Sequence, residues 1–223
     1  RLLLMAVSFM FFGIPIYYLL EVYYNPKAIQ TTHNLTAYLN LMTERVTLPK
    51  SIRKEIIHKL GNIKGKKILE FGCSVGTLTK HLAEEVGKKG KVYATDISEK
   101  DIYIVKKRMA KAGHRHVHCI HDVNHHNRVH PKVPKVHHTV SIGVIGHLRN
   151  IDQVLKHMSQ RMSKGSTILF VDYDKFLDLI PNQPWLDDDK KIKSTFKKAG
   201  FKVEIERKQG FAWTYIFIGG KKI

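Results

Sequence analysis

The chain has 223 residues, enough for one domain with a buried core and a short additional segment. Lysine and arginine total 38 against 19 acidic residues, and the net charge of +19 favours a polyanionic partner, either nucleic acid or the anionic face of a membrane. The only two cysteines, Cys73 and Cys119, exclude a disulfide framework and indicate reduced thiols.

Residues 2–20 form an apolar segment without a charged residue. As a helix it would measure about 28 Å, close to the hydrocarbon thickness of a bilayer. We expect residues 1–24 to be an N-terminal hydrophobic helix, transmembrane or monotopic, that anchors the protein. The basic remainder would then lie on the cytoplasmic side, following the positive-inside preference. A cleaved signal peptide and a helix buried against the domain are the alternatives.

Residues 25–65 are predicted to form a linker and two helices that cover one side of the following domain. The linker contains Pro26 and extends to Thr32. The first helix is predicted at 35–45, and the second begins at Pro49 and ends at Gly61.

From residue 66 onward, apolar strands alternate with amphipathic helices. Strands are predicted at 66–71, 91–95, 116–121, 138–143, 166–172, 201–208 and 212–219, and helices at 76–86, 99–112, 150–162 and 188–199. The alternation predicts an α/β fold with a Rossmann-like, doubly wound, mostly parallel seven-stranded sheet. The connection at Gln209-Gly210 predicts an antiparallel hairpin at the edge of this sheet.

The first strand passes directly into a turn of small residues and then into a helix. Gly72, Ser74 and Gly76 let the backbone of this turn approach a ligand at the helix N-terminus. The second strand ends at Asp96, twenty residues after Gly76. A doubly wound sheet presents an acid to ribose hydroxyls at this distance.

These strand ends resemble those of the class I S-adenosylmethionine-dependent methyltransferases. The resemblance rests on Glu70, Gly72, Ser74, Gly76, Asp96, His121 and Asp122. It covers roughly residues 50–223, with the methyltransferase domain itself at 66–223. One position departs from the family pattern, because Ser74 replaces the middle glycine.

The resemblance implies S-adenosylmethionine as cofactor, in a pocket that the linker and helices of residues 25–65 would cover. Asp96 would accept hydrogen bonds from both ribose hydroxyls, Glu70 would lie near the methionine amine, and Asp122 would accept from the adenine amino group. The predicted cofactor-binding residues are Glu70, Gly72, Ser74, Gly76, Asp96, Ile97, Asp122, Val123 and Gly143. Simple helix capping by Asp96 and an Asx turn at Asp122 remain structural alternatives.

Three residues at the ends of the fourth and fifth strands are candidates for the acceptor side. His147 is predicted to be a base or orienting group, because methyl transfer needs an aligned acceptor and, where necessary, removal of its proton. Asp172 and Tyr173 could hold a cationic or amine acceptor. The alternatives are a histidine that starts a helix and solvated acids. An apolar loop at 177–186 suits acyl chains or contact with the amino-terminal helices.

The function predicted from these features is that of a membrane-anchored methyltransferase acting on a lipid or other membrane amphiphile. A phospholipid headgroup amine is the most concrete acceptor. The main alternative is an RNA methyltransferase. The others are a serine hydrolase with Ser74 in a Gly-x-Ser-x-Gly nucleophile elbow and an inactive cofactor-binding membrane adaptor. No Asn-Pro-Pro-aromatic signature follows the fourth strand, which weighs against adenine or glutamine N-methylation.

Nine histidines lie between Gly113 and His138. Histidines at alternate positions of a strand share one face, so zinc is one interpretation of this segment. We expect no metal there, because the strand register already accounts for Asp122. The preferred interpretation is a solvated loop that gains positive charge as the pH falls.

Overall fold

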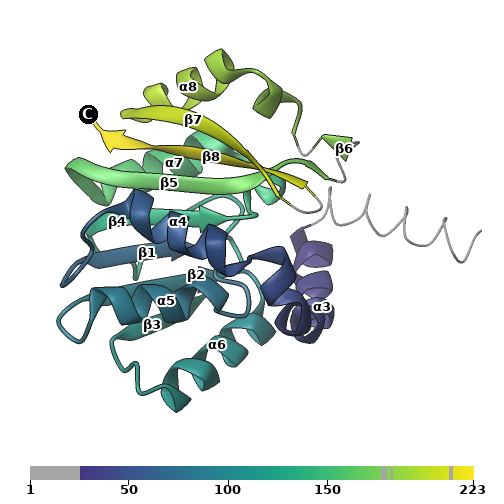
Figure 1. Cartoon of the computed structure of the whole chain (residues 1–223), viewed down its shortest axis with the longest axis vertical. Helices are drawn as coiled ribbons and strands as arrows, with labels where there is room; N and C mark the ends of the chain where they lie inside the picture. The colour runs from purple at the N-terminus through teal and green to yellow at the C-terminus, as the bar shows by residue number, and fades with distance from the viewer. Residues whose placement is uncertain (1–25, 177–179, 182, 211–212) are drawn as a thin grey trace, which may run out of the picture.

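The computed structural model describes residues 26–176, 180–181, 183–210 and 213–223. A central sheet is covered by helices on both faces (Figure 1). The hydrophobic helix predicted at 1–24 lies outside the described residues, as do positions 177–179 and 182 of the apolar loop. Where the structure is described, no helix is long and apolar enough to cross a bilayer.

Seven of the eight strands that the described residues contribute to the sheet lie in the order β3-β2-β1-β4-β5-β8-β7. They are β1 (Lys67–Phe71), β2 (Lys91–Asp96), β3 (Val117–His121), β4 (Val136–Ile142), β5 (Met162–Phe176), β7 (Phe201–Gln209) and β8 (Trp213–Lys222). β1 to β5 run parallel, whereas β8 runs antiparallel between β5 and β7. A short β6 (Ile180–Pro181) pairs with β5. The predicted parallel sheet with an antiparallel hairpin is confirmed.

The helices cover the two faces unequally. They are α3 (Pro26–Thr47), α4 (Lys50–Leu60), α5 (Thr77–Val86), α6 (Glu99–Lys111), α7 (Ile151–Gln160) and α8 (Asp189–Lys198), with short 3-10 helices η2 (Ile145–His147) and η3 (Pro184–Asp187). Along β1, Ile68 packs with α4 and α5, whereas Leu69 packs with α7 and α8. Because successive side chains of a strand point to opposite faces, this apolar strand is buried on both sides.

The first helix is longer than predicted. α3 begins at Pro26, whereas residues up to Thr32 were expected to be a linker. Proline is tolerated in the first helical turn, because the N–H that it lacks has no partner within the helix there. Pro26 therefore starts the helix. The second helix follows Pro49 and ends before Gly61, as predicted.

The apolar loop after β5 contributes to the core. Leu186 of η3 is fully buried in the cluster formed with α7 and α8, and Trp185 packs against that cluster. For these two residues, burial in the domain replaces the predicted contact with acyl chains or amino-terminal helices.

Candidate active site

The carboxyl ends of the parallel strands meet at one edge of the sheet, beside α3 (Figure 1). A cavity of about 250 Å³ opens there, between the turn after β1, the ends of β2, β4 and β5, and α3. Its walls include Glu70, Gly72, Ser74, Asp96, Ile97, Gly143, His147 and Tyr173 of the predicted site residues. Open α/β sheets bind ligands at this edge.

The turn after β1 is held by the neighbouring strand. The backbone N–H groups of Gly72 and Cys73 both donate to the carbonyl oxygen of Thr95, at 2.9 and 3.0 Å. Ser74, with φ 45°, is the one non-glycine residue with positive φ among the described residues. Gly76, with φ 83°, does not line the cavity. A Cβ atom added to it would lie 3.0 Å from the side chain of Val105. The turn is therefore fixed by backbone hydrogen bonds and close packing.

Asp96 holds this turn and also faces the cavity. Its Oδ2 accepts from the backbone N–H of Ser74 at 2.8 Å, and its Oδ1 accepts from that of Ser98 at 3.0 Å. Ser98, rather than Asp96, is the N-cap of α6, since its hydroxyl accepts from the Asp101 N–H. Each oxygen of Asp96 keeps a lone pair for a ligand hydroxyl.

Glu70, the next-to-last residue of β1, lies on the cavity wall. Burial raises the pKa of its carboxyl group to about 8, against the lowering effect of the Thr79 hydroxyl, which donates to Oε2 at 2.6 Å; nearby Asp96 raises it further. Near neutral pH, the protein without ligand therefore holds Glu70 mainly protonated. A cationic group brought beside it would favour the charged form.

Replacing Glu70 with glutamine should stabilise the fold and weaken the binding of the cofactor. The folded protein keeps a proton on Glu70 that the unfolded chain releases from pH 4.5 upward, so the free energy of unfolding falls as the pH rises towards 8. Glu70→Gln removes this loss. We therefore expect denaturant titrations at pH 7.5 to show a free energy of unfolding about 1–3 kcal/mol higher than that of the wild type. Calorimetry should show about tenfold weaker binding of S-adenosylmethionine. The exposed Glu85→Gln is the control, and equal stability curves for both variants would contradict the burial argument.

The acceptor side of the cavity carries largely uncharged groups. Burial lowers the pKa of His147 to about 4, with a smaller contribution from His33, and burial raises the pKa of Tyr173 above its usual range. Asp172 is not on the cavity wall, because its carboxylate accepts from the N–H groups of Ile145 and Tyr173, both at 2.8 Å. The structure therefore gives Asp172 a role in shaping the ends of β4 and β5.

Asp122 and Val123, predicted to contact adenine, also lie outside the cavity wall. Asp122 Oδ1 accepts from the Asn124 N–H at 3.0 Å and pairs with Arg128 Nη2 at 3.4 Å. The side chain of Val123 is 51% exposed. The Asx turn considered for Asp122 is therefore present.

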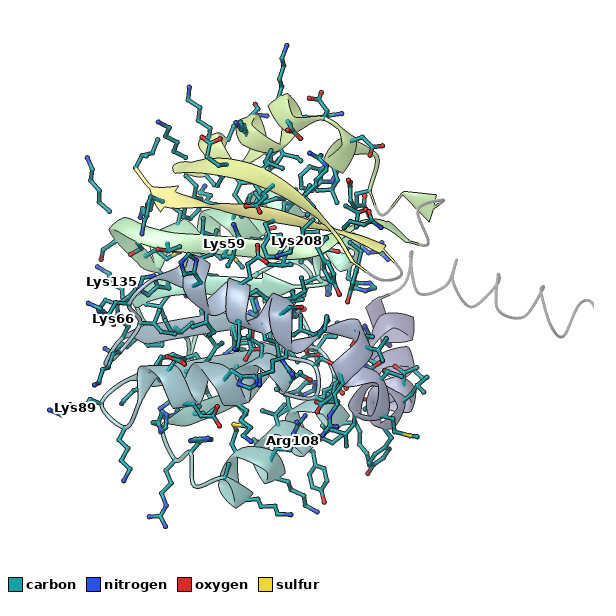
Figure 2. All side chains as sticks on the ribbon, viewed as in Figure 1. Lys59, Lys66, Lys89, Arg108, Lys135 and Lys208 are labelled. Atoms are coloured by element: carbon teal, nitrogen blue, oxygen red, sulfur yellow. The ribbon has the colours of Figure 1, made fainter. Side chains whose placement is uncertain are left out.

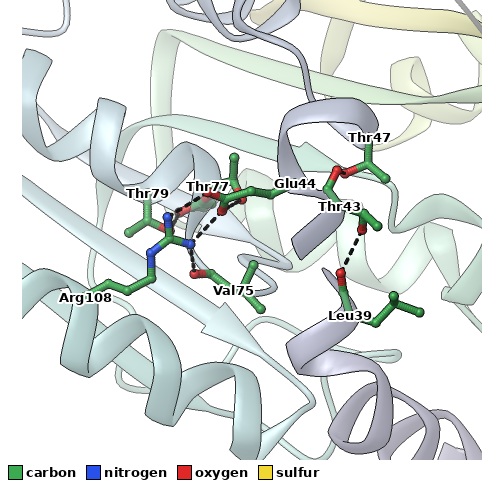
Figure 3. Close-up of polar contacts among 9 residues, drawn as sticks. Leu39, Thr43, Glu44, Thr47, Val75, Thr77, Thr79 and Arg108 are labelled. Carbon is green, nitrogen blue, oxygen red and sulfur yellow. Dashed lines mark hydrogen bonds and ion pairs between the residues drawn. The ribbon is translucent and has the colours of Figure 1, made fainter. Parts of the chain in front are cut away.

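Sequence patterns did not identify the residues that α3 contributes to the cavity. These are His33, Asn40, Glu44 and Thr47. Glu44 accepts from Arg108 Nη1 and Nη2 at 2.7 and 3.1 Å and from the Thr77 hydroxyl at 2.6 Å, while Arg108 also donates to the Val75 carbonyl at 2.7 Å (Figure 3). Glu44 thus ties α3 to the glycine-rich turn. It is the single acid of α3, which was the available signal.

Two histidines of the 114–138 segment, His125 and His126, also line the cavity. His125 is 5% exposed, stacks on Phe71 with ring centroids 3.7 Å apart, and its Nε2 lies 3.1 Å from Thr95 Oγ1. Burial lowers its pKa to about 4. The interpretation of the segment as a solvated loop is therefore wrong at this position.

The residues that could hold a metal ion lie elsewhere. In the described parts of the chain, one group brings ligand atoms within 4.8 Å of one another, namely His33, Asp96 and Asp101. No histidine of the 114–138 segment belongs to it.

Comparison with known proteins identifies the domain. Residues 69–168 match the family model described as a methyltransferase domain. This match covers less than half of the chain. It indicates an S-adenosylmethionine-dependent methyltransferase domain in this region, with S-adenosylmethionine as cofactor.

The methyltransferase domain has both sequence relatives and structural neighbours. Demethylmenaquinone methyltransferase of Geobacillus stearothermophilus is 31% identical over 90 residues, which cover 40% of this chain and only 38% of that protein. An S-adenosylmethionine-dependent methyltransferase from Aquifex aeolicus has the same fold, with a TM-score of 0.66, 16% identity and coverage of 90% and 100% of the two chains. Magnesium protoporphyrin IX methyltransferase from Synechocystis, solved with bound S-adenosylhomocysteine, gives a TM-score of 0.68, 14% identity and coverage of 89% and 99%.

Proposed function

We propose that this protein transfers the methyl group of S-adenosylmethionine to a membrane-resident amphiphile from the cytoplasmic side of a membrane. The observation that carries the proposal is the cavity at the carboxyl edge of the sheet. One side of it presents the glycine-rich turn and Asp96, and the other side presents His147, Tyr173 and α3. Donor and acceptor groups can therefore meet in one cavity.

The residues on the first side fit the cofactor. Asp96 has a lone pair on each oxygen for the two ribose hydroxyls, and the turn leaves the backbone open to the ligand. Glu70 offers a carboxyl group to the amine. When bound, S-adenosylmethionine supplies a methyl group on a positively charged sulfur. The negative charge of buried Asp96 complements that cation.

The second side fits an acceptor that is largely apolar. His125 and His147 are neutral at pH 7, because burial lowers the pKa of each to about 4. Apolar side chains complete the walls, among them Leu48, Ile142 and Leu148. Neutral His147 can orient an acceptor through a hydrogen bond to a ring nitrogen. Removal of water by these walls would strengthen that hydrogen bond.

Three observations support a membrane-resident acceptor. Residues 2–20 contain no charged residue, and the net charge is +19. A sequence relative is named for methylation of demethylmenaquinone. A phospholipid headgroup amine is the concrete candidate, since basic surfaces concentrate at anionic lipid. Lys66, Lys89 and Lys135 lie on the side of the molecule away from α3 (Figure 2).

The alternative function of a serine hydrolase would need a histidine hydrogen-bonded to the Ser74 hydroxyl. No hydrogen bond of the described residues joins the Ser74 hydroxyl to His147, the predicted base of the acceptor side, although both line the cavity. A nucleophilic serine needs such a base within hydrogen-bond distance.

The function can be tested by calorimetry and by methyl transfer. We expect micromolar binding of S-adenosylmethionine and S-adenosylhomocysteine, followed by transfer of labelled methyl from the donor into the lipid fraction of added membranes. A His147→Gln variant should bind the donor normally and transfer methyl at least about tenfold more slowly. Label in RNA instead of lipid would contradict the acceptor class. Binding without transfer to any fraction would indicate a cofactor-binding adaptor.

A further inference from the structure

The outer face of α3 is apolar and exposed. The exposed fractions are 55% for Tyr38, 57% for Leu39, 81% for Met42, 63% for Val46 and, on neighbouring α6, 48% for Tyr103. We call these five side chains the outer face. They make up five of the seven large hydrophobic side chains that the described residues expose to this degree. Such a concentration on one surface marks a place of contact.

Helical spacing explains why these residues face away from the domain. Tyr38, Met42 and Val46 recur every four residues and therefore share one side of α3. The opposite side lines the cofactor cavity through residues such as Asn40 and Glu44. Glu44 is the single acid of α3, and its carboxylate is bound to Arg108 and Thr77. The outer side of α3 therefore carries no negative charge.

Basic side chains border the outer face. Lys27 and Arg45 of α3 are exposed. On α6, Lys100 Nζ lies 5.0 Å from the ring centroid of Tyr38, and Lys107 Nζ lies 4.5 Å from that of Tyr103. Lysines beside aromatic and aliphatic side chains form the pattern of a helix that lies in a membrane interface.

We infer that the outer face docks on the surface of an anionic lipid bilayer. The basic border complements anionic headgroups, and the apolar side chains can enter the interface. Only residues 21–25 separate the uncharged residues 2–20 from α3, which begins at Pro26. A second copy of this chain fits less well, because its basic border would meet an identical basic border.

This docking extends the proposed function. Only the reason for docking, which is access to a membrane-resident acceptor, rests on the proposed function. With the outer face on lipid, the inner side of α3 would hold the cofactor cavity next to the headgroups. An amphiphilic acceptor could then reach the cavity without crossing water. The test needs neither donor nor acceptor, so its failure leaves methyl transfer itself untouched.

A fluorescent probe on the full chain tests the contact. Met42→Cys, in a Cys119→Ser background that leaves only buried Cys73, is labelled with an environment-sensitive nitrobenzoxadiazole group. The control carries the same label at Lys89→Cys, exposed on the opposite side of the molecule (Figure 2). Each protein is mixed with vesicles of phosphatidylcholine, with or without phosphatidylglycerol, that carry nitroxides on their acyl chains.

We expect a blue shift and nitroxide quenching at position 42 with the anionic vesicles, weakening as salt is added, and neither change at position 89. Substituting Met42→Glu and Val46→Glu should abolish the response of a probe moved to Leu39→Cys. An unchanged probe at position 42 on vesicle-bound protein would overturn the inference. A blue shift that is already present before vesicles are added would also overturn it. If that shift does not depend on protein concentration, residues 1–25 cover the outer face; if it does, a second copy of the chain covers it.

Discussion

Replacing Asp96 with asparagine should weaken binding of S-adenosylhomocysteine at least about 100-fold, since two charge-assisted hydrogen bonds to the ribose would be lost. Asparagine keeps one oxygen to accept from a backbone N–H. Alanine would leave both Ser74 N–H and Ser98 N–H without their acceptor and destabilise the turn as well. Asparagine therefore separates ligand binding from folding better than alanine does.

The measurement is calorimetric titration with S-adenosylhomocysteine, accompanied by thermal unfolding without ligand. Asp152→Asn, in the first turn of α7, serves as the matched control for loss of a carboxylate at a helix start. Wild-type affinity in Asp96→Asn would reject the ribose assignment. A loss of affinity that merely follows a loss of folded protein would assign Asp96 to the turn alone.

Substituting Gly72 with alanine should have the largest effect on stability. Gly72 has φ 85°, and its added Cβ would lie 2.2 Å from Val144 Cγ2, far inside van der Waals contact. Backbone strain and overpacking together should lower the free energy of unfolding by about 3 kcal/mol. Because the turn borders the cavity, cofactor affinity should fall as well. Denaturant titration and calorimetry measure the two effects.

Two variants separate strain from steric overlap. Gly65 has φ 73° and nothing within 4 Å of an added Cβ, so Gly65→Ala carries the strain alone. It should cost only about 1–2 kcal/mol. Combining Gly72→Ala with Val144→Ala should cost at least about 1 kcal/mol less than the sum of the single changes. Additive effects would show that Val144 is not the obstacle.

Most of the fold was predictable because its signals are local and agree with one another. In β1, Ile68 and Leu69 supply the continuous apolar run of a strand buried on both faces, and Gly72 marks the turn after it. The hairpin of β7 and β8 was visible from its glycine-containing connection. The start of α3 was missed because Pro26 fits both a linker and a first helical turn.

In the candidate site too, the residues with a local sequence signal were predicted and those without one were not. Glu70 and Asp96 lie at or next to the carboxyl ends of β1 and β2, and Ser74 follows β1, so chain order alone predicted their shared edge of the sheet. Asp122 follows β3 and Asp172 lies in β5, yet backbone N–H groups bind their carboxylates, a geometry that spacing does not reveal. The contributions of α3 depend on how a helix docks across the domain, which residue order does not specify.

The sheet order also constrains when this domain can fold during synthesis. β8 is the last strand in the chain but pairs with both β5 and β7, and Tyr215 on it faces Tyr173 of the cavity wall in the register. The hydroxyls of both tyrosines donate to the Thr47 carbonyl at the end of α3. A nascent chain that has released α3 and β5 must therefore wait for β8 before the Tyr215 hydrogen bond and the pairing of β5 with β8 can form. Until then, one edge of β5 stays unpaired and open to chaperones or to aggregation.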